Sequence, residues 1–363
     1  MKRTFIGIMV LLMSSVLMAQ ARPGWYKVFT GKVGNMQVTM HLHKAGESYC
    51  GYIWFAQNQW PMPLYYNLSS NKNDSLEISA MGGNFSFVFS GVLTDKTYSG
   101  KTTLQKDNNP SKNASFQLQV SDDKIFTPFN FYSSNGTGKL LPQIKNESEA
   151  SYLIASIWPA ESNLIATAVK KYVQKALEIK VPIADPSNWM TDEKNKFLAN
   201  WKKENSKISP KEASEMGLSL SVEQEDRVMV MYENEQILSV AHYSYGFSGG
   251  AHGNFATALE TIQKSTGKKV LLNDVLNPAG IKALPLILDK VARVQFEIKN
   301  NNPLDQNYFL VNKIPPSENF YVTSKGIGFL YAPYAIKSFA DGEINLLVPF
   351  TALGPYLQTA FKH

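Results

Sequence analysis

A glycine-rich stretch near residue 250 carries the side chains best suited to nucleophilic chemistry. Gly246-Phe-Ser-Gly-Gly250 has the G-x-S-x-G pattern, and His252 follows Ser248 by four residues. A serine hydrolase needs its serine on a strand–turn–helix and a histidine that arrives from elsewhere in the chain. Here both residues lie between two segments that alternate apolar and polar residues. We therefore interpret the stretch as a hairpin and predict no catalytic residue, with a hydrolase using Ser248 and His252 as the alternative.

His252 has two further interpretations. An imidazole in a glycine-rich loop can bind a ligand or respond to pH. It can also brace the loop through a hydrogen bond to a nearby carbonyl or to Asp274, because buried polar groups normally find partners. We favour bracing for His252. Asp274 is most simply a turn or N-cap residue before the helical region that follows it.

Two other histidines share one face of a predicted strand. His41 and His43 are two residues apart in the alternating stretch Met36–His43. Two imidazoles can begin a zinc site, but a catalytic zinc usually has three protein ligands, and no H-E-x-x-H motif or cysteine cluster supplies more. We expect this face to be exposed, and we predict neither a metal site nor a cofactor.

Aromatic residues are concentrated early in the chain. Exposed rings there could stack on sugars or form a protein interface, but aromatic residues bury well and favour strands, so we expect most of them in a core. The residues are Tyr49, Tyr52, Trp54, Phe55, Trp60, Tyr65 and Tyr66.

The first residues predict export. Lys2 and Arg3 form a positive start, an apolar run covers residues 5–18, and Ala19-Gln-Ala21 supplies small residues for cleavage. The apolar run is too short for a stable membrane span. We expect a signal peptide over residues 1–19 and a soluble mature chain, periplasmic or secreted, without a transmembrane segment.

The composition of the chain limits which cellular compartment and which classes of binding partner we expect. Cys50 is the single cysteine, so no intramolecular disulfide is possible, which favours a bacterial periplasm over a secreted eukaryotic chain. It also lies far from the cleavage site, so we expect no lipid anchor. The net charge is +6, from 36 basic and 30 acidic residues. This mild, dispersed charge predicts no nucleic-acid partner.

The length of 363 residues is typical of two domains. From Trp25 to Val120, short alternating segments separated by turn residues predict an all-β antiparallel barrel or sandwich of about eight strands, in a domain of residues 25–127. Residues 128–143 contain the polar, glycine-rich Ser133–Gly138 and are predicted to be a linker.

Residues 144–363 are predicted to form an α+β domain, with helices on a mostly antiparallel sheet. Apolar spacing predicts helices over Ser162–Ile179 and Thr191–Asn205, and Ser209-Pro210 opens a third. A further helical region follows Asp274. The predicted strands are residues 218–222, 227–232, 237–245, 255–262, 319–323, 327–331 and 344–350.

Three ordered motifs carry a family resemblance. They are Ser248-Gly-Gly-Ala-His-Gly253, then Thr266-Gly-Lys268 with Leu271-Leu-Asn-Asp274, then Pro333-Tyr-Ala-Ile336 with Phe339-Ala-Asp-Gly342 and Val348-Pro-Phe350. Together they resemble the C-terminal domain of RsiV-type proteins, over about residues 151–363. That domain occurs in lysozyme-sensing anti-sigma factors and beside the catalytic domain of a peptidoglycan deacetylase. Unlike the sensors, this chain shows no transmembrane helix or sigma-binding segment, and Ala335 stands where the family often has an acidic residue.

The resemblance implies an extracytoplasmic binding or sensing module. We therefore expect a bacterial envelope protein, a binder rather than an enzyme, whose partner is a lysozyme-like protein or a peptidoglycan or other glycan ligand. The alternative function is a hydrolase acting on cell-wall material. The residues we expect to contact the ligand are Tyr245, Phe247, Ser248, His252, Asn254, Asp274 and Tyr334.

Overall fold

The computed structural model describes residues 24–46, 48–57, 61–66, 75–82, 85–106, 112–141, 148–299 and 302–361. The predicted signal peptide and Trp60 lie outside these ranges. No helix within them is long and apolar enough to cross a membrane.

The N-terminal strands form a closed antiparallel barrel, as the alternating segments predicted. β1 pairs with both β2 and β8, which closes the sheet on itself. Alternate residues such as Met40, Leu42 and Phe89 fill the interior and are fully buried. The strands are β1 (Trp25–Val33), β2 (Met36–Ala45), β3 (Ser48–Phe55), β4 (Met62–Tyr66), β5 (Ser75–Gly82), β6 (Phe85–Leu93), β7 (Thr97–Lys106) and β8 (Lys112–Val120).

A strand occupies most of the segment that we predicted to be a linker. β9 (Phe129–Lys139) pairs antiparallel with β10 (Glu149–Pro159) along its whole length. Its glycines serve packing, because a Cβ at Gly136 would lie 3.0 Å from the side chain of Lys194 on the covering helix. The linker prediction is therefore wrong for β9, since a polar, glycine-rich composition does not reveal a helix packed overhead.

The strands β9 and β10 belong to a six-stranded sheet with the order β14-β13-β12-β11-β10-β9. Its pairs are antiparallel except β10–β11, which is parallel. A parallel pair needs a crossover, and three helices lie in this one. The remaining strands are β11 (Val222–Glu233), β12 (Ile237–Phe247), β13 (Asn254–Gln263) and β14 (Lys268–Lys269), and the helices are α1 (Leu164–Ala176), α2 (Ser187–Glu204) and α3 (Pro210–Met216).

The helices of the crossover lie close to the predicted positions. One helix and one strand begin at a residue other than the predicted one. α3 begins with the predicted cap, because Ser209 and Glu212 form a reciprocal capping box. α2 begins at Ser187, four residues before the predicted start, and Thr191 is an internal residue whose hydroxyl donates to the carbonyl of Ser187. Residues 217–220 form a 3-10 turn, so the strand predicted at 218–222 starts only at Val222.

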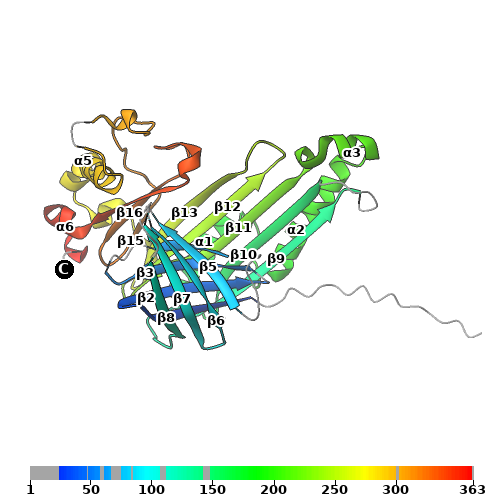
Figure 1. Ribbon diagram of the computed structural model, residues 1–363. Helices are drawn as coiled ribbons and strands as arrows, with labels where there is room; N and C mark the ends of the chain where they lie inside the picture. Colours follow the sequence, from blue (N-terminus) through cyan, green and yellow to red (C-terminus); the bar gives the residue numbers. More distant parts are fainter. Residues whose placement is uncertain are drawn as a thin grey trace, which may run out of the picture.

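The two faces of the six-stranded sheet have different covers. α1 and α2 lie on one face, while the barrel and a small sheet, β15-β16-β17, lie on the other (Figure 1). Helix α5, which precedes the small sheet in the chain, and α6, which follows it, pack on that sheet, and α4 contacts α5. Their bounds are α4 (Leu272–Val275), α5 (Pro278–Gln295) and α6 (Phe350–Leu353), with β15 (Phe320–Val322), β16 (Gly326–Tyr331) and β17 (Ile344–Pro349). The fold is thus a β-barrel followed by an α+β region, as predicted.

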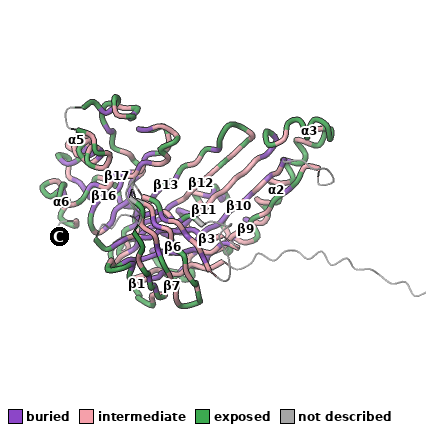
Figure 2. The backbone as a smooth tube through the Cα atoms, in the orientation of Figure 1, coloured by how far each residue is buried: buried purple, intermediate pink, exposed green. Residues whose placement is uncertain are grey.

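The barrel shares a core with the six-stranded sheet. Cys50 and Tyr52 of β3 belong to the same buried cluster as Val228 and Val240 of the sheet. Many of the residues where the two parts meet are accordingly buried (Figure 2). Of the early aromatic residues, Tyr52 and Phe55 are buried, whereas Tyr65 is 49% exposed.

This shared core corrects the prediction for His41 and His43. Both are fully buried, because the outer face of β2 lies against the sheet instead of water. Tyr26 shares a 2.8 Å hydrogen bond with His41 and stacks on His43 with ring centroids 4.7 Å apart. Burial lowers the pKa of both imidazoles to about 3, and for His43 the neighbouring His41 lowers it further.

Candidate functional site

The glycine-rich stretch is the predicted hairpin. β12 and β13 pair antiparallel up to Gly246 and Asn254, and residues 248–253 connect them. Gly249 has φ +78°, and a Cβ there would lie 1.9 Å from the carbonyl oxygen of Ser219. A Cβ at Gly253 would lie 2.4 Å from the ring of Tyr245. These two glycines are required by backbone conformation and close packing.

His252 lies in a small aromatic cluster at this end of the hairpin. Its Nδ1–H donates to the carbonyl of Gly253 at 2.9 Å, and its ring stacks on Phe339 with centroids 3.9 Å apart. Phe339 also contacts Phe255 at 5.6 Å and Tyr334 at 5.7 Å. We call His252, Phe255, Tyr334 and Phe339 the hairpin-end cluster. Tyr334 is 58% exposed and has φ +68°.

The other residues predicted to contact a ligand are only partly brought together. Phe247 ends β12 and Asn254 begins β13, so both lie near the hairpin-end cluster. Among the described residues, no hydrogen bond joins Ser248 to His252. Asp274 is remote: it follows the opposite end of β13 and accepts a hydrogen bond from the N–H of Leu271 at 2.8 Å, at the start of α4.

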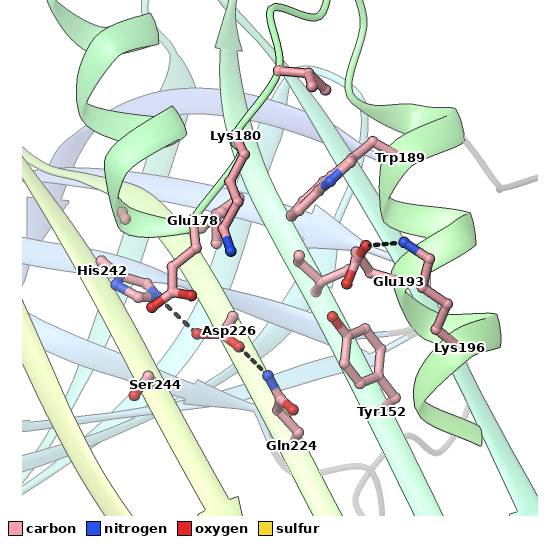
Figure 3. Close-up of a pocket in the computed structure, with 14 residues that line it drawn as sticks. Tyr152, Glu178, Lys180, Trp189, Glu193, Lys196, Gln224, Asp226, His242 and Ser244 are labelled. Carbon is pink, nitrogen blue, oxygen red and sulfur yellow. Dashed lines mark hydrogen bonds and ion pairs between the residues drawn. The ribbon is translucent and has the colours of Figure 1, made fainter. Parts of the chain in front are cut away.

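A separate cleft of about 740 Å³ opens on the helix-covered face of the sheet. It lies between strands β10, β11 and β12 and the segment that runs from the end of α1 into α2 (Figure 3). The lining residues are Tyr152, Ile154, Ala176, Leu177, Glu178, Lys180, Val181, Trp189, Glu193, Lys196, Gln224, Asp226, His242 and Ser244.

A fixed chain of polar side chains forms the floor of the cleft. The Nε2–H of His242 donates to Oδ1 of Asp226 at 2.8 Å, and Nε2 of Gln224 donates to its Oδ2 at 3.0 Å. Asp226 pairs across the strands with Ser244, which places His242 diagonally opposite on the same face. Gln224 and His242 together occupy both carboxylate oxygens of Asp226. The bond between Asp226 and Nε2 therefore holds the imidazole of His242 in one orientation. The described residues offer no hydrogen-bond partner to its Nδ1.

The walls of the cleft combine aromatic and charged side chains. The rings of Trp189 and Tyr152 lie along one side, beside an ion pair of 2.7 Å between Lys196 and Glu193 on α2 (Figure 3). Burial, and then the charges of Asp226 and Glu193, raise the pKa of Tyr152, so its hydroxyl stays a hydrogen-bond donor. Apolar rings beside fixed polar groups suit a ligand that has both polar edges and apolar faces.

None of the sequence patterns above predicts this cleft. Its signal in the sequence is the pair of polar alternations Gln224-x-Asp226 and His242-x-Ser244, in two strands joined by the short connection of residues 234–236. Polar residues two apart on adjacent strands share one face. Only the register and the helices above decide that this face is an open cleft. No group of three or more His, Cys, Asp or Glu residues suited to a metal ion occurs in the described part of the chain.

Two family models match the second part of the chain. Residues 144–255 match the model described as deacetylase PdaC, and residues 273–351 match a protein family of unknown function, DUF3298. The first range contains the cleft floor and most of the hairpin, and the second contains the Pro333-Tyr motif. No curated protein matches the chain.

Solved structures of DUF3298 family proteins resemble this chain. One from Bacteroides fragilis has a TM-score of 0.56 at 18% identity and covers 65% of this chain and 96% of its own. Another from Pseudomonas aeruginosa has a TM-score of 0.45 at 13% identity, with 65% and 97% covered. The likeness to the Bacteroides fragilis protein shows a shared fold over that part of the chain.

Proposed function

We propose that the chain is an exported module of the bacterial cell envelope that binds a cell-wall glycan in the cleft without transforming it. The observation that carries the proposal is the juxtaposition of Trp189 and Tyr152 with the fixed Asp226–His242 pair (Figure 3). The predicted signal peptide and the resemblance to RsiV-type domains support the envelope as the compartment.

The chemistry of the cleft matches a sugar chain. A sugar ring has an apolar face that packs on an aromatic ring and a rim of hydroxyl groups that donate and accept hydrogen bonds. Trp189 and Tyr152 offer the rings, and the Asp226–His242 pair offers polar groups whose orientation is already fixed. Such preorganisation lowers the entropy lost on binding.

We propose that the two domains have different roles: residues 144–363 bind the ligand, and residues 25–127 support them. The barrel lies against the face of the sheet opposite the cleft, so it stiffens the strands that carry Asp226 and His242 without contacting the ligand. Strand β9 connects the two parts, because it contacts β1 and β2 of the barrel and pairs with β10 of the sheet.

Calorimetric titration of the mature chain with chitotetraose, and with glycan fragments from purified cell walls, tests the proposal. We expect saturable binding that weakens at least tenfold in Trp189→Ala, because the stacking surface is removed. Trp25→Ala, which changes a half-buried tryptophan on the barrel, is the matched control and should bind like the wild type. Absence of binding to both probes would overturn the glycan proposal.

A lysozyme-like protein partner is the second candidate, favoured by the exposed Tyr334 in the hairpin-end cluster. Exposed tyrosines are common anchors in protein interfaces. Biolayer interferometry with lysozyme tests this idea. Loss of binding in Tyr334→Ala, with glycan titration unchanged, would support it, and absence of binding by the wild type would exclude lysozyme.

The geometry gives less support to a hydrolase that uses Ser248 and His252. The Nδ1 of His252 is bonded to the carbonyl of Gly253 and its ring is stacked on Phe339, as expected of a bracing residue. Labelling with a fluorophosphonate probe, compared between the wild type and Ser248→Ala, distinguishes the two. Labelling that disappears in the variant would favour the hydrolase.

A further inference from the structure

Helix α1 ends in a left-handed turn at Glu178, which has φ +54°. The N–H of Ile179 donates to the carbonyl of Gln174 at 2.8 Å, and the N–H of Glu178 donates to that of Lys175 at 3.3 Å. This is the helix ending in which glycine is the usual residue. An L-residue there is disfavoured because its Cβ approaches the following carbonyl oxygen.

The side chain of Glu178 extends into the cleft, toward the Asp226–His242 pair (Figure 3). Among the described residues, no hydrogen bond or ion pair involves its carboxylate. The two other carboxylates that line the cleft are already engaged, since Asp226 accepts from His242 and Gln224, and Glu193 pairs with Lys196. Glu178 therefore offers this cleft a carboxylate whose oxygens are open to a ligand.

A second helix shows that the strained conformation alone does not make a site. Glu297 ends α5 in the same way, with φ +55°, and the N–H of Ile298 donates to the carbonyl of Arg293 at 2.8 Å. Glu297 does not line the cleft. The two glutamates therefore share a backbone conformation and differ in what their side chains face, which makes Glu297 a matched control.

We propose that Glu178 determines the specificity of the cleft by accepting hydrogen bonds from two adjacent donors of a sugar ring, such as a hydroxyl group and the neighbouring acetamido N–H of a chito-oligosaccharide. A carboxylate has two oxygens that can receive such a pair. His242, held by Asp226, lines the same cleft and offers its Nδ1 as a further hydrogen-bonding atom. The ligand is thus a carbohydrate that offers hydrogen-bond donors on neighbouring ring positions at this end of the cleft. This inference rests on the proposed glycan-binding function.

Calorimetric titration with chitotetraose compares Glu178→Gly, Glu178→Gln and Glu297→Gly in the full mature chain. We expect binding to weaken about tenfold in Glu178→Gly, because hydrogen bonds to a charged group are lost. In Glu178→Gln one acceptor oxygen becomes a donor, so binding should weaken several-fold. Glu297→Gly should bind like the wild type.

Thermal unfolding separates binding from stability. Both glycine variants relieve a left-handed L-residue, so each Tm should rise by about 2 °C. Tight binding by the wild type together with unchanged affinity in both Glu178 variants would overturn the role of Glu178 and leave the proposed function intact. Absence of wild-type binding both to chitotetraose and to the cell-wall glycan fragments would instead overturn the proposed function and, with it, this inference.

Discussion

His43 on the outer face of the barrel accepts a hydrogen bond from the main-chain N–H of Val230 in the six-stranded sheet, at 3.2 Å between Nε2 and N. The register of β10 with β11 ends at Ser156 and Val228, so the amide of Val230 lies just beyond it. The two bonded residues are 187 positions apart in the sequence, and their hydrogen bond joins the barrel to the six-stranded sheet. Both residues are fully buried, and the ring must be neutral to accept the bond.

Stability should therefore fall in mild acid. The imidazoles of His41 and His43 have pKa values of about 3 in the folded chain against an ordinary value of 6.5. Between these values the unfolded chain binds more protons, so the stabilisation is complete above pH 6.5 and is lost as the pH falls toward 3. Each histidine contributes about 1.4 kcal/mol per pH unit in this window.

Urea unfolding at pH 7.5, 6.0 and 5.0 measures how steeply the free energy of unfolding changes with pH, which we call the slope. His43→Gln should make it shallower, because one titrating group is removed. His252→Gln replaces an exposed histidine and should leave the slope unchanged. Equal slopes in the wild type and His43→Gln would contradict the assignment.

Removal of the acceptor at residue 43 should destabilise the contact between barrel and sheet. His43→Leu leaves the N–H of Val230 buried without a partner, which costs about 1–3 kcal/mol of unfolding free energy. His43→Gln keeps an acceptor oxygen and should lose less. Chemical denaturation at pH 7.5 gives both values, and a His43→Leu variant as stable as His43→Gln would show that the hydrogen bond contributes nothing.

A buried ion pair fixes the segment that leaves the barrel. Glu233 is 1% exposed, pairs with Nζ of Lys264 at 2.7 Å and accepts from the N–H of Thr127 at 3.0 Å. Lys264→Met would leave an unpaired buried carboxylate, which costs about 3–5 kcal/mol. The double variant Lys264→Met, Glu233→Gln should recover part of this loss at pH 7.5. A double variant less stable than Lys264→Met alone would refute the charge argument.

The glycines of the hairpin should differ sharply in their tolerance of alanine. Gly253→Ala places a Cβ 2.4 Å from the ring of Tyr245, whereas the nearest atom to a Cβ at Gly250 is 4.0 Å away. We expect a loss of about 1–3 kcal/mol for Gly253→Ala, as for other overpacked sites. Gly250→Ala should be nearly neutral. Thermal unfolding of the two variants checks this, and equal Tm values would show that the hairpin relaxes without cost.

The sequence itself determined the features that depend on neighbouring residues. Period-two alternation with turn residues predicted the eight strands of the barrel, and the glycines near residue 250 predicted a hairpin. The capping box at Ser209 follows from the residue types at fixed spacing. Such signals are local, because backbone conformation and side-chain period are set within a few residues.

What covers each face of these strands depends on contacts in the tertiary structure. β2 alternates like a strand with one exposed face, yet His41 and His43 are buried because the sheet covers that face. The cleft likewise unites Tyr152, Glu178 and His242, which the register of three strands and the end of α1 bring together. Burial and cleft formation depend on contacts between distant segments, and a local pattern carries no information about which segment will be the cover.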